Sequence, residues 1–343
     1  MAKWLSAYYE DNIKLAADII KKGGLVAFPT ETVYGLGANA LDKLAVAKIF
    51  EVKNRPDFDP LIVHICRKED VFLYADQIED DVEKLIDHFW PGPLTIVVPK
   101  KDIIPSIVTA GNTTVALRMP KNNVALKLIE FAGVPIAAPS ANPFGYISPT
   151  SAFQVADTIG DKIDCILDGG KCQFGLESTV VMVKEGKIFL LRPGALEIEK
   201  IEKLLGKNIE FYKEENILSP GQIKKHYSPQ KEMILIKPVI NQEKIDYKAT
   251  IEKLYRVLEE KSIDYKDIFL LLPSYDFVVN EGFGVVDYFS ISYDLKDIAS
   301  NLFEKIYLAD KSDKNVIVVV GVKKEGLGLS IMNRLEKACN YEF

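Results

Sequence analysis

The chain has 343 residues, of which 48% are hydrophobic and 27% charged, and its formal net charge is −6. This composition is typical of a globular protein, and the length exceeds one hydrophobic core, so we expect two domains. No apolar run approaches the roughly 20 residues needed to cross a bilayer, and the first residues lack a signal-peptide core. We therefore expect a cytoplasmic protein with no membrane association.

Charge and cysteine content argue against two further classes. Both halves of the sequence are acidic, so neither has the basic excess of a dedicated nucleic-acid binder, although a local basic groove remains open. The four cysteines form no C-x-x-C pair and the chain has only three histidines, which disfavours a structural zinc site. We expect reduced, mostly buried thiols and no metal-ligand set.

Hydrophobic periodicity predicts mixed structure from the N-terminus to residue 208. A helix over 11–22 carries its apolar residues on one side and ends at Gly23 and Gly24. Strands are expected at 25–28, 61–65, 94–98, 114–119, 135–138, 165–167, 179–183 and 188–191. Helices are expected over 41–50, 82–89, 124–131 and 152–159. This order favours an α/β or α+β domain with a large mixed sheet.

Residues 209–230 read as a linker, because they combine a charged run with turn-forming Ser-Pro-Gly and Ser-Pro sequences. From 231 to 343 strands at 233–236, 268–272 and 316–320 alternate with helices near 245–260, 295–308 and 327–338. This alternation predicts a small parallel three-layer domain. It contains no G-x-G-x-x-G or phosphate-loop lysine sequence, so we assign it no nucleotide site of its own.

The stretch from 29 to 64 carries the strongest functional signal. The strand at 25–28 is followed by hydroxyls, including Thr32, and by glycines, and the next helix leads to Lys53 and Arg55. Two cations this close repel each other unless an anion lies between them, which suits a polyphosphate. His64 ends the following strand. Such groups at strand ends are typical of a site for small anionic molecules.

Polar residues follow several other predicted strands. Arg118 ends one strand and suits a carboxylate, although an ion pair with a neighbouring acid is an equal alternative. The remaining positions offer hydroxyl, amide or guanidinium groups, and they are Ser140, Asn142, Ser148, Ser178 and Arg192. The segment 148–150 also reads as a helix cap or a phosphate contact. Because ligands of open α/β sheets bind beyond strand ends, we expect one shared crevice.

These segments together resemble the Sua5/YrdC family of threonylcarbamoyl-AMP synthases, in its two-domain Sua5 form. The matching strings span both domains and the linker, and they include PTETVYGLGANA, KNRP, PLIVHI, WPGPLT, TVALRMP, PIAAPSAN, SPTSA, LDGG, GLESTVV, LRPGAL, SPGQIKKHYSP and GLGLSIMNRLEKA. The resemblance implies a YrdC-like twisted open mixed sheet with flanking helices over 1–208, a linker at 209–230, and a Rossmann-like parallel α/β domain over 231–343.

The resemblance also implies an activity. L-threonine, bicarbonate or CO2, and ATP would give threonylcarbamoyl-AMP and pyrophosphate, for modification of adenosine 37 in tRNA. A downstream threonylcarbamoyl transferase is an expected partner, and direct tRNA binding is possible but not required. By similarity, threonine would contact Thr32, His64, Arg118 and Ser178. ATP would contact Lys53, Arg55, Thr114, Ser140, Asn142, Ser148, Arg192 and Tyr227.

Lys53 and Arg55 would act in catalysis as electrostatic stabilisers of phosphate charge rather than as acid or base. Mg²⁺ is expected to be carried mainly by the ATP phosphates, because the chain shows no dedicated ligand set. Asp59 departs from the family, which usually has Asn there, and a carboxylate beside phosphates is unfavourable without a cation. We therefore leave Asp59 out of the nucleotide contacts or give it at most a metal-linked role.

Residues 219–229, with Tyr227, are expected to form a lid that shields the adenylate from water. Three other interpretations compete with this one. The chain could be a non-catalytic module that binds double-stranded RNA or tRNA, or a carbamoyl-transfer module of hydrogenase maturation, although the zinc-type C-x-x-C repeats of the latter are absent. Residues 231–343 could also have a purely regulatory role.

Overall fold

The structure, a computed structural model, describes residues 2–212, 217–221 and 226–343. The chain divides into two compact units. The first comprises Met1–Phe144 and Ser148–Ile223, and the second comprises Gly145–Ile147 and Lys224–Phe343. None of the described helices is both long enough and apolar enough to cross a membrane.

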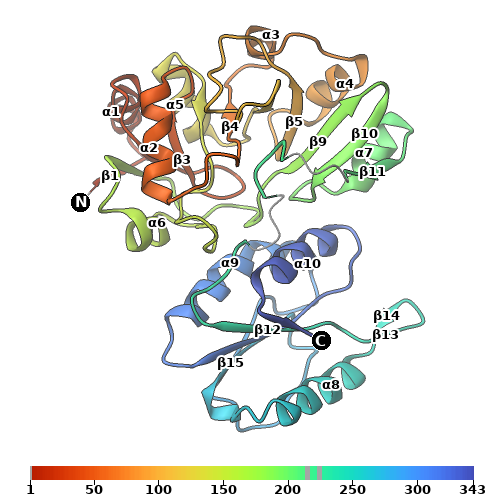
Figure 1. The fold of residues 1–343 in the computed structure, drawn as a ribbon. Helices are drawn as coiled ribbons and strands as arrows, with labels where there is room; N and C mark the ends of the chain where they lie inside the picture. Colours follow the sequence, from red (N-terminus) through yellow and green to blue (C-terminus); the bar gives the residue numbers. More distant parts are fainter. Residues whose placement is uncertain (1, 213–216, 222–225) are drawn as a thin grey trace. The chain divides into compact units, whose positions relative to one another are not determined.

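In the first unit, the described residues form a mixed sheet of eleven strands in the order β1-β8-β2-β3-β7-β4-β6-β5-β9-β10-β11 (Figure 1). The sheet contains both parallel pairs, such as β4 with β6, and antiparallel pairs, such as β5 with β6. The strands are β1 (Lys3–Ser6), β2 (Val26–Phe28), β3 (Gly35–Asn39), β4 (Ile62–His64), β5 (Leu94–Pro99), β6 (Thr114–Arg118), β7 (Ile136–Ala137), β8 (Cys165–Asp168), β9 (Thr179–Lys184), β10 (Lys187–Arg192) and β11 (Ile209–Phe211).

The helices of the first unit enclose two hydrophobic cores. Helices α1 (Glu10–Lys21) and α5 (Asn123–Ala132) lie side by side (Figure 1). Their apolar residues pack against β2, β7 and β8. A larger core takes apolar residues from the other helices, which are α2 (Lys43–Lys53), α3 (Val71–Tyr74), α4 (Asp80–Phe89), α6 (Ala152–Ile159) and α7 (Ile198–Leu205). The buried sheet fixes the strand ends that the sequence analysis singles out.

The ends of α2 and α6 explain how two site segments are placed. Asp42 caps α2 through its carboxylate, and Asn54 ends that helix in the left-handed conformation, with φ of 50°. The helix therefore ends immediately before Arg55, which lies in the loop that follows. Helix α6 is capped by Ser151, whose hydroxyl accepts from the backbone N–H of Gln154 in a capping box. The expected cap at 148–150 is therefore displaced, which leaves Ser148 outside the helix.

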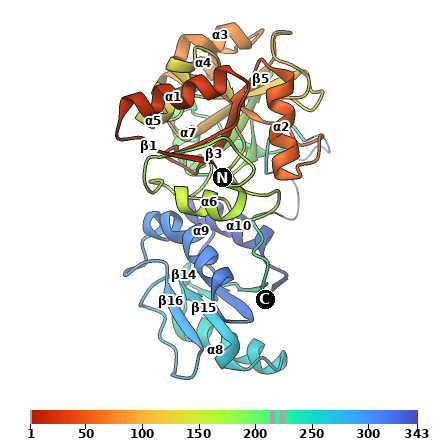
Figure 2. The same ribbon diagram turned by 90° about the vertical axis from the view of Figure 1, so that its left-hand side faces the viewer.

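The second unit has a parallel sheet of five strands in the order β16-β15-β17-β12-β18. Figure 2 shows α8 on one face of this sheet and α9 on the other, with α10 beside α9. Its strands are β12 (Glu232–Ile236), β15 (Ile268–Leu272), β16 (Val285–Tyr288), β17 (Val316–Val320) and β18 (Tyr341–Glu342), and β13 (Ile240–Asn241) pairs with β14 (Lys244–Ile245). Its helices are α8 (Tyr247–Glu260), α9 (Leu295–Lys311) and α10 (Leu327–Ala338).

The α/β fold class and the parallel second domain are confirmed. The expected linker differs from the structure in one respect, because β11 pairs in parallel with β10 and so belongs to the first sheet. The division between units at 223 and 224 falls inside the expected 209–230 segment, and the tripeptide 145–147 belongs to the second unit. All four cysteines are free thiols, and burial raises the pKa of Cys165 and of Cys172 to about 12.

Candidate active site

The centre of the candidate site lies where β4 and β6 end together. The two strands run parallel, and their register pairs His64 with Arg118. The Arg118 guanidinium donates through Nη2 to Thr32 Oγ1 at 2.9 Å and pairs with Glu31 Oε1 at 2.8 Å. All four side chains are buried. The structure therefore brings together three of the four residues expected to bind threonine.

Arg118 retains hydrogen-bonding capacity. Its Nε is buried and has no hydrogen-bond partner among the described residues. A buried N–H without an acceptor is costly, so this face of the guanidinium is suited to receive an anionic oxygen from a ligand. The two alternatives weighed for Arg118 are thus compatible: it forms an ion pair with Glu31 and still presents a donor. Glu31 is a site residue that motif reading missed.

His64 is held as a neutral imidazole. Burial, together with the neighbouring Arg118 charge, lowers its pKa from the usual 6.5 to about 3. Its ring packs edge-to-face against Phe28, with centroids 6.1 Å apart. His64 therefore offers a neutral polar ring beside Arg118 and adds no positive charge at neutral pH.

Lys53 is fully enclosed at the end of α2. Its Nζ donates to the carbonyl oxygen of Ser140 at 2.6 Å and to that of Asn142. Burial lowers the pKa of Lys53 well below its usual range, and the nearby Arg55 charge acts in the same direction, while Asp59 opposes both. The ammonium is thus tied to the backbone of the loop that carries two of the expected nucleotide contacts.

Asp59 supplies the anion beside the two cations. Its Oδ2 lies 2.9 Å from Arg55 Nη2, and both side chains are almost completely buried. Arg55 also donates to the carbonyl oxygens of Asp59 and Pro60, at 3.0 and 2.8 Å. The carboxylate at the position that departs from the family pattern therefore neutralises Arg55.

Ser178 and Arg192 form a second polar group at the start of β9. Arg192 donates to the Ser178 carbonyl oxygen at 2.8 Å and to Ser178 Oγ at 3.1 Å, and its Nη1 donates to the Pro220 carbonyl oxygen at 3.2 Å. Thr95, on β5, shares a hydrogen bond of 2.7 Å with Ser178 Oγ. Sequence reading missed Thr95, although its position in the WPGPLT string was the available signal.

Ser148 and Thr114 extend the site in two directions. The Ser148 hydroxyl donates to Glu177 Oε1 at 2.6 Å, and both residues are buried. Thr114 lies at the opposite end of β6 from Arg118, about 13 Å away along the strand. It lines a cavity of about 340 Å³ together with Val97, Met182 and other residues of the same strands. A ligand that touches both Arg118 and Thr114 must therefore be long.

Tyr227 belongs to the second unit. Its ring is buried there, 5.6 Å from the ring of Phe303, and the Arg334 guanidinium lies 5.1 Å from its centroid. Residues 213–216 and 222–225 of the expected linker lie outside the described residues. The nucleotide contact and the lid assigned to Tyr227 stay predictions.

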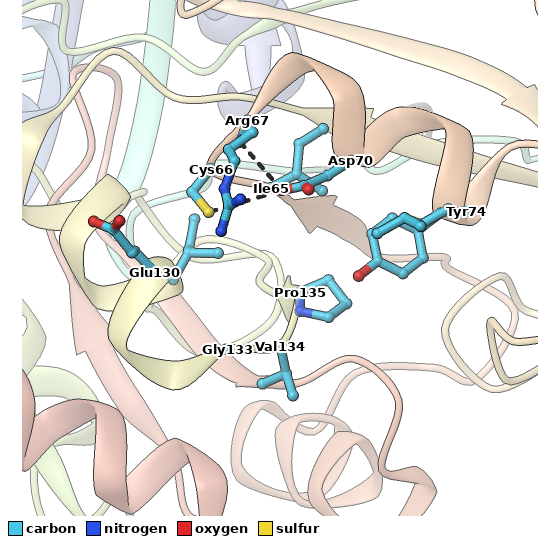
Figure 3. A pocket seen from close by; sticks show the side chains of 11 residues that line it. Ile65, Cys66, Arg67, Asp70, Tyr74, Glu130, Gly133, Val134 and Pro135 are labelled. Atoms are coloured by element: carbon cyan, nitrogen blue, oxygen red, sulfur yellow. Dashed lines mark hydrogen bonds between the residues drawn. The ribbon is translucent and has the colours of Figure 1, made fainter.

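A separate pocket opens just beyond His64 along the chain. It has a volume of about 290 Å³ and lies between the end of β4, helix α3 and the end of α5. Figure 3 shows Cys66, Arg67 and Asp70 on one side of it and Glu130 on another. None of the residues expected to bind threonine or ATP lines this pocket. It is therefore distinct from the candidate active site.

The fold is an α/β domain with one open mixed sheet, and its buried polar strand ends are suited to small anionic ligands. Two family models match the chain. Residues 18–194 match the Sua5/YciO/YrdC model, described as "Telomere recombination". Residues 196–340 match a model described as "Threonylcarbamoyl-AMP synthase, C-terminal domain".

Relatives match over both units. A threonylcarbamoyl-AMP synthase of Pyrococcus abyssi is 42% identical, covering 97% of this chain and 95% of the relative. One from Bacillus subtilis is 36% identical, covering 96% and 93%. The crystal structure of P. abyssi Sua5 complexed with L-threonine has a TM-score of 0.87 and 40% identity, covering 100% of this chain and 99% of that one. The chain belongs to the Sua5/YrdC family of threonylcarbamoyl-AMP synthases, in the two-domain form, as the sequence motifs predict.

Proposed function

We propose that this protein makes threonylcarbamoyl-AMP and pyrophosphate from L-threonine, bicarbonate or CO2, and ATP. The observation that carries the proposal is the buried Arg118 guanidinium, which is bonded to Thr32 and Glu31 and still presents an N–H with no partner in the described parts of the chain. The names of the relatives and the threonine complex of the P. abyssi protein support it. This evidence favours an enzyme over the non-catalytic RNA-binding module considered from sequence.

At the threonine end, Arg118 holds the carboxylate, and Thr32 and Ser178 offer hydroxyls. A charge-assisted hydrogen bond from a guanidinium N–H fixes the orientation of a carboxylate as well as balancing its charge. The substrate amine must be neutral to attack CO2; the new N–C bond gives an N-carboxylate, and the nitrogen loses one proton to solvent. His64 is well suited to this step because its low pKa keeps an extra positive charge away from the reacting nitrogen.

At the nucleotide end, an oxygen of the N-carboxylate attacks the α-phosphate, and pyrophosphate leaves. The negative charge increases on the phosphate oxygens, so Lys53 and Arg55 contribute by electrostatic stabilisation and positioning. The backbone of Ser140 and Asn142, which holds Lys53, is part of the same arrangement. Removing one such stabilising group typically lowers the rate on the order of 10²–10³-fold.

Mg²⁺ would neutralise charge on the transferred phosphates, and we propose that it enters mainly bound to ATP. Among the described residues there is no group of three or more His, Cys, Asp or Glu side chains that could hold a metal ion. Lys53 and Arg55 act on the same phosphate charge from the protein side.

The product is a reactive mixed anhydride, so it must be passed to an acceptor before water attacks it. We propose a threonylcarbamoyl transferase acting on adenosine 37 of tRNA as the consumer. The net negative charge of the chain gives no general electrostatic attraction to tRNA. The proposed step uses only small substrates, so it does not require this protein to bind tRNA.

Pyrophosphate release from ATP tests the proposal. We expect release to require both L-threonine and bicarbonate, and L-serine to support less turnover, because a methyl group in an apolar pocket is worth about 1–3 kcal/mol. Detection of threonylcarbamoyl-AMP in the same reaction identifies the product. Pyrophosphate release that is independent of threonine contradicts the assignment.

A further inference from the structure

A tripeptide from the middle of the first domain's sequence is part of the second unit. Residues 145–147 pack with the second unit, whereas the chain on either side of them, up to Phe144 and from Ser148, belongs to the first. Within the second unit the Tyr146 hydroxyl donates to Asp310 Oδ2 at 2.6 Å. Both side chains are more than nine-tenths buried. The hydrogen bond is therefore shielded from competing water.

Asp310, on α9, is held from its other side as well. Its Oδ1 accepts from the backbone N–H groups of Gln230 and Lys231, at 2.8 and 3.0 Å. The Lys231 ammonium in turn donates to carbonyl oxygens at the end of α9. A buried carboxylate with three donors is fixed in place, so it offers Tyr146 a rigid acceptor.

Gly145 lets the chain enter the second unit at this point. It adopts a left-handed conformation, with φ of 79°, which glycine reaches without strain. Its carbonyl oxygen accepts from the Ser228 backbone N–H at 2.8 Å, also within the second unit. The tripeptide is thus anchored by its backbone as well as by the Tyr146 hydroxyl.

The residues immediately before the tripeptide hold the catalytic cations. Lys53 donates to the carbonyl oxygens of Ser140 and Asn142, and the Phe144 N–H donates to the Lys53 carbonyl oxygen at 2.8 Å. The Phe144 ring lies 5.9 Å from the Arg55 guanidinium carbon. Immediately after the tripeptide, Ser148 bonds to Glu177. The anchored residues 145–147 are therefore covalently continuous, on both sides, with expected nucleotide contacts.

We propose that Tyr146 and Asp310 are positioning residues for the reaction, which fix the loop 140–148 and, through it, Lys53 and Arg55. Through this bond the second domain takes part in catalysis. This inference rests on the proposed function, because the loop positions the residues that are expected to bind ATP in that reaction. Two substitutions isolate the bond: Tyr146→Phe removes the hydroxyl, and Asp310→Asn removes the charge.

Steady-state kinetics in the full-length protein give the first test. We expect each substitution to lower kcat/KM for ATP by about tenfold or more, since a hydrogen bond to a charged group is lost. The double variant should lose no more than the worse single variant, because the two residues act as one unit. The dissociation constant for threonine, measured without ATP, should change less than twofold. Full activity in both single variants, or equal losses in ATP and threonine binding, overturns the proposal.

Hydrogen exchange gives a second test that does not depend on turnover. Amides of the 140–148 segment should exchange faster in Tyr146→Phe and Asp310→Asn than in the wild-type protein. The matched control is Asp313→Asn, because Asp313 lies just after α9 with an 82% exposed side chain. Unchanged exchange in the two variants contradicts the inference. If the wild-type protein shows no threonine-dependent pyrophosphate release, the proposed function is wrong. The exchange experiment still tests whether Tyr146 and Asp310 anchor the 140–148 segment.

Discussion

Arg55 and Asp59 form a buried ion pair, with Nη2 and Oδ2 2.9 Å apart, next to the enclosed Lys53 ammonium. The guanidinium has further bonds to two backbone carbonyl oxygens and lies over the Phe144 ring. Two cations so close in the sequence repel each other unless an anion lies nearby, and the chain supplies Asp59 beside Arg55. The charge of the Arg55 guanidinium is therefore already balanced by a carboxylate of the chain itself.

The first prediction concerns this ion pair. Asp59→Asn keeps an acceptor for Arg55 but removes the competing negative charge, so we expect the KM for ATP to fall severalfold. The free energy of unfolding should decrease by about 1–3 kcal/mol, because a charged hydrogen bond is weakened. ATP titration and chemical denaturation measure the two effects. Asp57→Asn, at an exposed position two residues away, is the control, and a higher KM for ATP in Asp59→Asn contradicts the prediction.

The second prediction concerns the guanidinium that carries the proposed function. Arg118→Lys keeps the charge but loses the planar fork, so the dissociation constant for threonine should increase about 10- to 100-fold. ATP binding should stay close to wild type. Calorimetric titration with threonine measures the change, and Arg67→Lys, at an exposed position outside the site, is the matched control. If the Arg118→Lys variant binds threonine with wild-type affinity, Arg118 does not contribute to threonine binding.

The third prediction concerns proton uptake at Lys53. Its pKa is lowered well below 10.5 in the free protein, mainly by burial, and the ATP phosphates should raise it again. Between the free and bound pKa values, ATP binding then takes up a proton, so affinity decreases as the pH rises through this window. Calorimetry in buffers of different ionisation enthalpy detects the uptake. The Lys53→Arg variant, which is always charged, should show none, and the absence of uptake in the wild type falsifies the idea.

The fourth prediction concerns acid stability. The pKa of His64 is about 3 in the folded protein and near 6.5 when unfolded. Between these values the unfolded chain binds the extra proton, so this group lowers the free energy of unfolding by about 1.4 kcal/mol per pH unit as the pH falls. Denaturation at several pH values should show a shallower dependence in His64→Gln than in wild type. The exposed His88, changed to Gln, should leave the slope unaltered.

Much of the fold could be predicted because its elements have clear periodicity. Strand β17 and helices α6 and α10 have the expected bounds, and the other long helices differ from expectation by a few residues at their ends. Strand β3 was not among the expected strands, because its glycines do not give the pattern of bulky apolar residues typical of a strand. In the structure a Cβ on Gly37 would lie 2.8 Å from atoms of Phe28 and Ile136, so close packing requires the glycine within the strand.

The contacts between site residues could be predicted only in part. Motif reading placed Thr32, His64 and Arg118 together, and parallel strand ends explain why this succeeded. It could not assign partners to Glu31 or Asp59, because each ion pair depends on side-chain directions that a linear pattern does not contain. The pairing of Tyr146 with Asp310 joins residues 164 positions apart. No spacing rule links them.

The tripeptide 145–147 has a consequence for exchanging domains between family members. The chain crosses between the two units at three places, of which the linker is only one. A chimaera joined solely at the linker would pair Tyr146 with whatever residue the foreign α9 presents in place of Asp310. Functional chimaeras should therefore require that the tripeptide and its carboxylate come from the same parent. The part of this protein that must be exchanged together is thus not one continuous segment of its sequence.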